Sequence, residues 1–336
     1  RGSDLLLSPG ASPRVRRDGV LHVLWPDAQP LTEADTAALL RPLLTPEQAH
    51  ALEADRSLDF AFTWRESARL RANLFYQRGG LAAVFRALPL HIPGFDELGV
   101  PEPVRALIGR HQGLVLVTGP TGSGKSTTQA AMIDHLNRTQ ACHVITVEDP
   151  IEYIHAHALA LVDQREIGSD ALSFPQALRV AFREDADVVL IGEMRDPETI
   201  EAALGIAETG HLVIATLHTN DSAQALDRVI DSFPAGRHQQ VRTQLANTLA
   251  GVVYQQLLPA VGGGRVAAFE VLIVNSAVRT LLKDGKTNQI RTHLQTNVRD
   301  GSQTLERHLS RLVAEGRVSE DDARQRSLYP DEIGRT

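Results

Sequence analysis

The strongest constraint on this chain is an eight-residue stretch, GPTGSGKS, that runs from Gly119 to Ser126. It satisfies the pattern G-x-x-x-x-G-K-[ST] at every fixed position. The apolar run 113–118 before it predicts a buried strand, and the helix-forming residues 127–136 after it predict a helix. Such a loop turns successive backbone N–H groups toward a phosphate, and the positive end of the helix faces the same point. The stretch therefore predicts a nucleoside triphosphate site, the alternative being a glycine turn that merely joins a strand to a helix.

The side chains of this loop divide between phosphate and metal. The Lys125 ammonium provides a mobile positive charge for the terminal phosphates, and the Ser126 hydroxyl provides a ligand for Mg²⁺. The residues expected to bind the nucleotide are Gly119, Thr121, Gly122, Ser123, Gly124, Lys125, Ser126 and Thr127.

The composition is that of an ordinary globular protein with room for two domains. Of the 336 residues, 34 are Lys or Arg and 41 are Asp or Glu, and the resulting net charge of −7 argues against general nucleic-acid binding, although a local basic patch stays open. The single cysteine, Cys142, excludes an intrachain disulfide framework and a thiolate zinc cluster. The apolar runs are too short for a membrane span, so we expect a cytoplasmic protein. Because the first residue is Arg1 rather than Met, a signal ahead of it stays open.

Two regions of different pattern are separated by a short segment that contains proline and glycine. Residues 1–88 predict a small mixed domain, residues 89–96 a linker, and residues 97–336 an α/β domain with a mostly parallel sheet. In the first domain we expect a hairpin around Asp18-Gly19, helices at 32–44 and 45–53, and strands at 58–64, 67–76 and 81–88. In the second we expect strands at 113–118, 143–147, 159–162, 187–191, 211–217 and 265–273. Its expected helices are 125–137, 173–183, 197–208, 221–231 and 237–257, with a helical tail at 275–284, at 302–315 and after Ser319.

Two acids follow strands of the predicted parallel sheet. Glu193 comes after the apolar run 188–191 and one glycine, and its long side chain is a candidate ligand for Mg²⁺. Glu148 ends the strand at 143–147 and is a candidate to orient or deprotonate the attacking water. The alternative is a pair of solvated acids. Because the carboxyl ends of strands in such a sheet border the ligand crevice, the functional interpretation is favoured.

Histidines and arginines give weaker signals. His211 and His218 bracket the predicted strand 211–217, and His218 is a candidate to sense the γ-phosphate through hydrogen bonds; a zinc site there matches no familiar ligand spacing. His155 and His157 share a strand face and are candidates to bind a metal, but two solvated loop histidines are the simpler explanation. Arg69 and Arg71 share one face of their predicted strand. They are candidates to stabilise phosphoryl transfer from outside the nucleotide domain, the alternative being surface charges on an edge strand.

Four strings in a fixed order resemble the signature motifs of the type II/IV secretion and pilus ATPase superfamily. They are GPTGSGKST (119–127), ITVEDPIEY (145–153), VVLIGEMRDPETI (188–200) and TGHLVIATLHT (209–219), which resemble its Walker A, Asp box, Walker B and His box. In addition, SARLRANLFYQ (67–77) resembles the arginine strand of the family, and AVRTLLKD (277–284) resembles a motif of type IV pilus retraction ATPases, with Arg279 kept. The resemblance spans residues 2–325.

This resemblance implies specific roles and an architecture. It implies ATP and Mg²⁺, Glu148 as the catalytic glutamate, Glu193 as the Walker B acid, His211 and His218 as His-box residues, and Arg69 and Arg71 as arginine fingers. It also implies a PAS-like N-terminal domain, a RecA-like ATPase domain and a homohexamer. Such a ring acts on an inner-membrane platform protein of the pilus machinery, at the cytoplasmic face, to retract pili for twitching motility. A PilU-like accessory ATPase, a pilus-assembly or secretion ATPase, a RecA-like nucleic-acid translocase and a non-hydrolysing nucleotide sensor stay open as alternatives.

Overall fold

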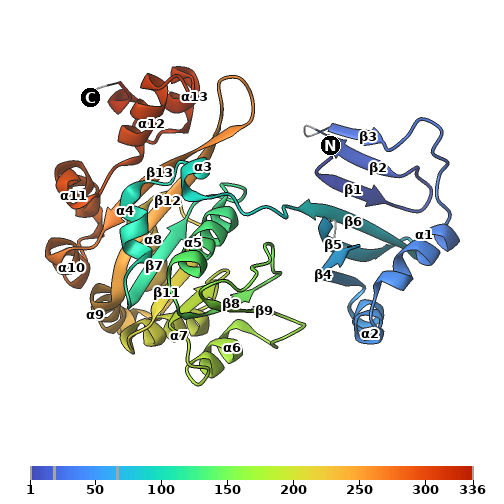
Figure 1. Ribbon diagram of the computed structural model, residues 1–336, viewed down its shortest axis with the longest axis horizontal. Helices are drawn as coiled ribbons and strands as arrows, with labels where there is room; N and C mark the ends of the chain where they lie inside the picture. Colours follow the sequence, from blue (N-terminus) through green and yellow to red (C-terminus); the bar gives the residue numbers. More distant parts are fainter. Residues whose placement is uncertain (1, 18–19, 66–67, 335–336) are drawn as a thin grey trace. The chain divides into compact units, whose positions relative to one another are not determined.

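The computed structural model describes residues 2–17, 20–65 and 68–334. Within them the chain forms two compact units (Figure 1). The first unit runs to His91 and also takes in Pro150–Ile154, and the second contains Ile92–Asp149 and His155 onward. Residues 89–94 have no regular structure, but a helix already begins at Phe95, so the last two residues of the predicted linker are helical.

The first unit is an antiparallel sheet with two helices. Its strands lie in the order β3-β2-β1-β6-β5-β4. Their bounds are β1 Asp4–Leu7, β2 Arg14–Arg17, β3 Val20–Val23, β4 Ser57–Trp64, β5 Ala68–Gln77 and β6 Gly80–Leu88. The helices α1 (Glu33–Leu40) and α2 (Pro46–Asp55) begin at capping boxes on Thr32 and Thr45, and they bury Leu40 and Leu52 against the sheet.

The sequence-based expectations for this unit were incomplete at its N-terminus. Strands β2 and β3 pair as the predicted hairpin, while its turn at Asp18-Gly19 lies outside the described residues, as does Ser67 at the start of the strand predicted at 67–76. Strand β1 was not predicted. Its four residues are too few to show an alternating pattern, and pairing with β2 and β6 on either side fixes its conformation.

The second unit is built on a seven-stranded sheet in the order β13-β12-β7-β11-β10-β8-β9. The strands are β7 Gly113–Thr118, β8 His143–Glu148, β9 Leu161–Glu166, β10 Val188–Ile191, β11 Leu212–Leu217, β12 Leu249–Pro259 and β13 Arg265–Ile273. Neighbouring strands are parallel except at the edge, where β13 runs antiparallel to β12. The carboxyl ends of β7, β8, β10 and β11 therefore meet at one edge of the sheet, which we call the loop end.

Helices cover both faces of this sheet (Figure 1). One face packs on α3–α5 and the other on α6–α11, in two separate apolar cores. The bounds of the helices are α3 Phe95–Leu98, α4 Glu102–Ile108, α5 Lys125–Thr139, α6 Phe174–Ala181, α7 Pro197–Glu208, α8 Ser222–Asp231, α9 His238–Thr248, α10 Ser276–Lys283, α11 Ile290–Thr296, α12 Leu305–Ala314 and α13 Glu320–Arg326. This doubly covered parallel sheet is the predicted RecA-like α/β fold, and α12 and α13 form the predicted helical tail.

One predicted helix was wrong in its C-terminal part. The expectation was a helix at 237–257, but α9 ends at Thr248 and the chain continues as the buried strand β12. Strand β12 pairs with β7 on one side and with β13 on the other, through a turn that contains Gly262, Gly263 and Gly264. The β-branched pair Val252-Val253 favours a strand, and these non-local partners decide the outcome.

Two smaller boundaries also differ. The strand predicted at 159–162 is β9, which begins at Leu161 and continues to Glu166, because it pairs with β8 along its whole length. The helix predicted at 302–315 begins only at Leu305, after the N-cap Thr304. Among the described residues, none of the helices combines the length and the apolar character needed to cross a bilayer.

Candidate functional site

The glycine loop follows the buried strand β7 directly and ends at the first turn of α5. Gly119, Gly122 and Gly124 have φ of 147°, 78° and 90°, values that side-chain-bearing residues rarely adopt. The turn is closed by the Ser123 N–H, which donates to the Pro120 carbonyl at 3.2 Å. The sequence therefore folds here into the expected strand, loop and helix, and the N-terminus of α5 points into the loop.

Lys125 lies at the centre of the loop. Its buried side chain folds back so that Nζ donates to the carbonyls of Gly119 at 2.9 Å and Pro120 at 3.1 Å. The same ammonium lies 3.3 Å from Nδ1 of His218, at the end of β11. The positive charge is therefore held within the loop, next to a residue of the neighbouring strand.

Glu193 reaches the same point from β10. Its Oε1 lies 3.3 Å from Nε2 of His218, and its Oε2 accepts a 2.7 Å hydrogen bond from Arg195. Burial pushes the pKa of Glu193 upward, but the hydrogen bonds from Arg195 and the His218 ring, together with the positive charge of Arg195, outweigh this and hold its pKa below the ordinary value. A side chain in place of Gly192 would be crowded, because its Cβ would lie 3.3 Å from the Glu148 backbone.

His218 thus bridges the loop cation and the acid of β10. The Lys125 ammonium can only donate, so Nδ1 of His218 accepts and Nε2 carries the proton that it donates to Glu193. This assigns the neutral Nε2–H tautomer to the imidazole. A change in the position of Lys125 would therefore alter the hydrogen bond to Glu193 through the His218 ring.

Glu148 ends β8, the strand next to β10. Its Oε1 accepts hydrogen bonds from the Thr146 hydroxyl at 2.8 Å and from the Gln164 amide at 3.3 Å. Both donors come from strands of the sheet, so the carboxylate is oriented by rigid elements rather than by a loop. Sequence reasoning missed Thr146, Gln164 and Arg195; the period of two that places Thr146 and Glu148 on one face was the available signal.

The structure does not bring His211 to this site. His211 precedes β11 at the end of the sheet opposite to the loop end, and its Nδ1 lies 3.0 Å from the Thr209 hydroxyl and 3.1 Å from the Ile206 carbonyl. His218 is seven residue steps further along the strand, a distance of roughly 23 Å. His155 is buried and His157 accepts a hydrogen bond from the Val162 N–H, so the expectation of two solvated loop histidines is wrong for His155. Within the described ranges no group of three or more His, Cys, Asp or Glu side chains is arranged to hold a metal ion.

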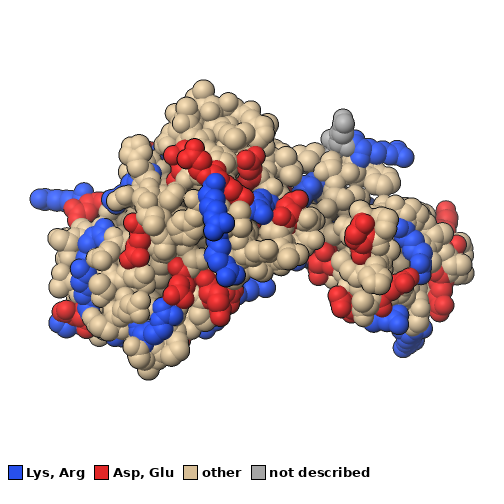
Figure 2. All heavy atoms as spheres, turned by 90° about the horizontal axis from the view of Figure 1, so that it is seen from below, with Lys and Arg blue, Asp and Glu red and all other residues tan. Residues whose placement is uncertain are grey.

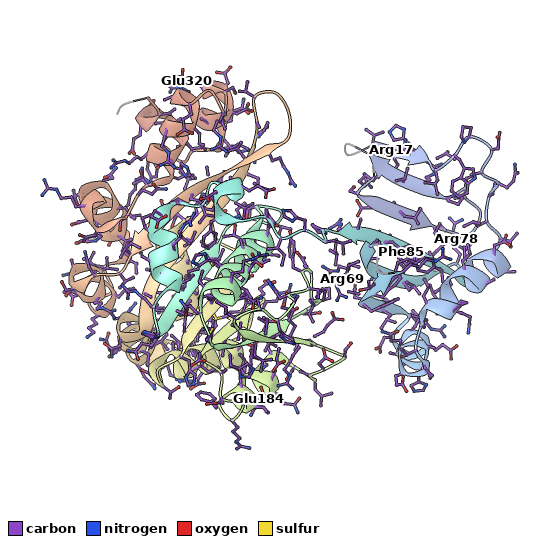
Figure 3. All side chains as sticks on the ribbon, viewed as in Figure 1. Arg17, Arg69, Arg78, Phe85, Glu184 and Glu320 are labelled. Atoms are coloured by element: carbon purple, nitrogen blue, oxygen red, sulfur yellow. The ribbon has the colours of Figure 1, made fainter. Side chains whose placement is uncertain are left out.

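Arg69 and Arg71 lie on one face of β5 in the first unit, where Figure 3 labels Arg69. Arg69 is buried, and its Nε donates to the Ile151 carbonyl at 3.0 Å. Arg71 is partly exposed, 3.9 Å from an oxygen of Asp59 on β4. The two side chains therefore differ, one held by a backbone carbonyl and the other on the surface beside an acid.

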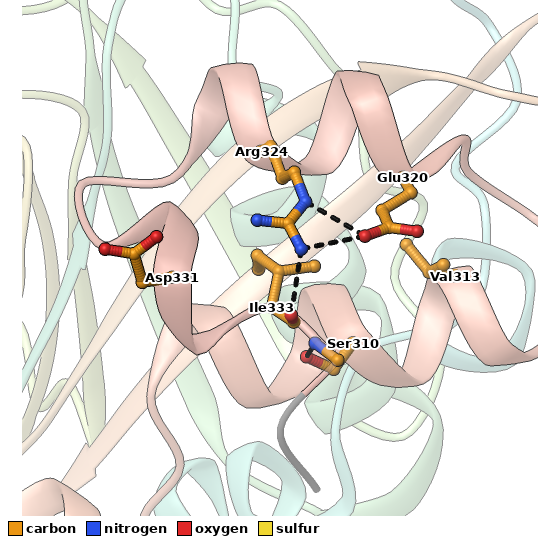
Figure 4. Close-up of a pocket in the computed structure, with 7 residues that line it drawn as sticks. Ser310, Val313, Glu320, Arg324, Asp331 and Ile333 are labelled. Atoms are coloured by element: carbon orange, nitrogen blue, oxygen red, sulfur yellow. Dashed lines mark hydrogen bonds and ion pairs between the residues drawn. The ribbon is translucent and has the colours of Figure 1, made fainter.

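Neither the charge distribution nor a cavity in the C-terminal tail points to another site. Figure 2 shows Lys and Arg interspersed with Asp and Glu on the face it presents, without a broad basic field. A cavity of about 560 Å³ lies in the C-terminal tail between α12 and α13 (Figure 4). Its cation, Arg324, is already bonded to Glu320 and to the carbonyls of Pro330 and Ile333. This cavity therefore contains no set of unsatisfied polar groups.

The loop itself does contain such groups. The buried hydroxyls of Thr118 and Ser123 have no hydrogen-bond partner among the described residues. For Mg²⁺, the donor set is suitable: Glu193 is held in its ionised form, and Ser126 presents a half-buried hydroxyl in the first turn of α5. The residues present therefore fit a nucleotide with its metal ion. Fold and loop together define a P-loop nucleoside triphosphatase.

Comparison with known proteins agrees. A family model described as type II/IV secretion system protein matches residues 54–325. The type IV pilus retractation ATPase PilT of Pseudomonas aeruginosa is 45% identical over 98% of this chain and 95% of its own length. The twitching motility protein of Neisseria gonorrhoeae is 44% identical over 88% of this chain and 80% of its own. A crystal structure of the pilus retraction motor PilT with bound ADP has a TM-score of 0.92 at 46% identity and covers all of this chain and 96% of that one. This chain therefore belongs to the type II/IV secretion system ATPase family.

Proposed function

We propose that this protein is an ATP-hydrolysing hexameric motor that retracts type IV pili and so drives twitching motility. The observation that carries the proposal is the contact chain Lys125–His218–Glu193 at the end of the glycine loop, in a chain similar over its whole length to PilT. We further propose that the ring works at the cytoplasmic face of the inner membrane, on a platform protein of the pilus machinery.

The site residues divide the work of ATP hydrolysis. The backbone N–H groups of the glycine loop bind the phosphates, and Lys125 leaves the carbonyls of Gly119 and Pro120 to contact the terminal ones. Mg²⁺, held by Ser126 and Glu193, would neutralise the charge that develops on the phosphate oxygens. The Glu148 carboxylate, oriented by Thr146 and Gln164, accepts the proton of the attacking water.

His218 connects the terminal phosphate to the acid. When Lys125 turns toward the phosphate, Nδ1 of His218 loses its donor, and the hydrogen bond from Nε2 to Glu193 changes with it. In this proposal the neutral ring is the sensor that reports the presence of the γ-phosphate to the strand that carries Glu193.

The arginines are proposed to act between copies of the chain. Arg69 and Arg71 would stabilise the transferring phosphoryl group bound by a neighbouring subunit, because a guanidinium delivered from outside the loop is a recurrent solution for this chemistry. We expect Arg69→Ala to lower ATP turnover by about 10³-fold with little change in ATP affinity. Arg78→Gln, which alters an exposed arginine in the turn after β5, is the matched control and keeps its rate. An unchanged rate in Arg69→Ala removes that residue from the mechanism.

Two experiments test the function. Steady-state phosphate release should disappear in Glu148→Gln, because its amide cannot take the proton of water; equal release in the variant would exclude this role for Glu148. Deletion of the gene should leave cells piliated but unable to move on surfaces. Bald cells would instead indicate an assembly motor, and stimulation of the ATPase by DNA or RNA would indicate a translocase.

A further inference from the structure

A glutamine on β12 contacts the glycine loop. Gln255 is 1% exposed, and its Nε2 donates to the Ser123 carbonyl at 2.6 Å. This is a side-chain hydrogen bond between segments 132 residues apart in sequence. It links the middle of the loop to a strand that follows the alternating strands and helices.

The same residue explains two of the loop glycines. A Cβ on Gly119 would lie 2.3 Å from the Gln255 carbonyl oxygen, and one on Gly124 would lie 3.1 Å from Gln255 Nε2. Residue 255 therefore packs against the beginning, the middle and the end of the loop. This close approach sets the distance between the glycine loop and β12.

The hydrogen bond also sets the direction of a peptide group. In a trans peptide the C=O and the following N–H point in opposite directions. Because Gln255 holds the Ser123 carbonyl toward β12, the Gly124 N–H of the same peptide points away from β12. That is the orientation in which a loop N–H faces a bound phosphate.

We propose that Gln255 is a positioning residue for the phosphate loop, which holds the Ser123–Gly124 peptide so that its N–H faces the phosphates of the nucleotide. The inference rests on the proposed function, since it concerns the same nucleotide site. It adds a residue that is outside all four signature strings. Loss of the Gln255 amide leaves the Ser123 carbonyl buried without a donor and frees the peptide to turn.

The neighbouring glutamine offers a matched control. Gln256 lies next along β12, where side chains alternate between faces, and its amide donates to the Tyr254 hydroxyl instead of to the loop. Gln255→Leu and Gln256→Leu therefore remove the same group from the same strand. We expect Gln255→Leu to weaken ADP binding by about tenfold and to raise the KM for ATP by a similar factor, with a smaller change in kcat. Gln256→Leu should change ADP affinity by less than about twofold.

The outcomes separate the two proposals. If the wild type and Gln255→Leu bind ADP equally well, the role of Gln255 is overturned and the proposed function stays in place. Wild-type protein that binds no ADP overturns both. Thermal unfolding of both variants, measured with and without ADP, distinguishes weaker binding from a destabilised fold. A purely structural role of Gln255 would lower the melting temperature of Gln255→Leu both with and without ADP, and would leave the ADP affinity of the folded protein unchanged.

A second variant keeps the test decisive if Gln255→Leu does not fold. In Gln255→Glu the protonated acid can donate to the Ser123 carbonyl, whereas the carboxylate repels both that carbonyl and a phosphate. Burial raises the pKa of such a carboxyl group, so its protonation falls in an accessible range. We expect the ADP affinity of Gln255→Glu, relative to wild type, to improve as the pH is lowered from 8 to 6. A ratio that does not change with pH would overturn the positioning role.

Discussion

The two ends of the seven-stranded sheet carry similar side chains with different partners. At the loop end, His218 contacts both Lys125 and Glu193, which come from different elements. At the opposite end, His211 contacts its own neighbourhood at Thr209 and Ile206, and Arg279 of α10 donates to carbonyls where α9 ends and β12 begins. In the proposed mechanism, a histidine or a cation takes part because of the end at which it lies. Both ends bring together residues that are distant in sequence, but in open α/β sheets ligands bind beside the carboxyl ends of the strands.

The largest expected effect is at the loop cation. Lys125→Ala should weaken ADP binding by about 100-fold, because a charged hydrogen bond to phosphate is lost. Isothermal titration with ADP measures this directly. Lys283→Ala, which removes an exposed lysine of α10, is the control and should bind ADP as the wild type does. Equal ADP affinities of the two variants would contradict the proposed difference between the two ends of the sheet.

The two histidines that flank β11 give the sharpest paired test. His218→Ala should lower ATP turnover by about 100-fold, since it breaks the link between Lys125 and Glu193. His211→Ala, at the other end of the same strand, should leave turnover within about twofold of wild type. Steady-state phosphate release by the two purified variants decides the matter, and equal losses would contradict the account.

Arg279 should matter for stability and not for nucleotide binding. Its guanidinium donates to the carbonyls of Ala246, Asn247 and Leu249, which completes the hydrogen bonding at the end of α9. Burial and the nearby Arg110 lower the pKa of Arg279, so the interaction is made at a desolvation cost. Arg279→Ala should reduce the free energy of unfolding by ~2 kcal/mol, measured by urea denaturation, with unchanged ADP affinity. A large loss of ADP affinity would mean that this end, too, acts on the site.

The smallest expected effect concerns the way the free energy of unfolding depends on pH in the acidic range. The pKa of Glu193 is lowered in the folded protein, so its ionised form stabilises the fold above the ordinary value of 4.5, and this stabilisation is lost as the pH falls through the lowered pKa. Arg195→Met removes one cause of that lowering. The variant should be less stable than wild type by at most about 1 kcal/mol at pH 7, since Arg195 is largely exposed, and the difference should vanish once the pH has fallen below the lowered pKa. A difference that persists when Glu193 is protonated in both proteins would show that Arg195 acts by packing.

Local patterns were sufficient to predict part of the site. The glycine loop, the two acids after their strands and His218 were recognisable because each depends on a short run of neighbouring residues. Gln255 was not, since it lies in the segment predicted as a helix at 237–257. The Val252-Val253 pair and the glycine-rich turn before residue 265 were the signals for a hairpin. His211 was expected at the site, but the structure places it at the opposite end of the sheet. Two histidines at the two ends of a strand do not indicate which of the ends lies beside the glycine loop.

The measurement that tests the account most directly is the ATPase rate per subunit as a function of protein concentration, with the molecular mass determined in the same samples. The account requires Arg69 and Arg71 of one copy to act on the nucleotide of another, so the rate per subunit should rise as the ring assembles in the presence of Mg²⁺. A strictly monomeric protein that hydrolyses ATP at the full rate would contradict it.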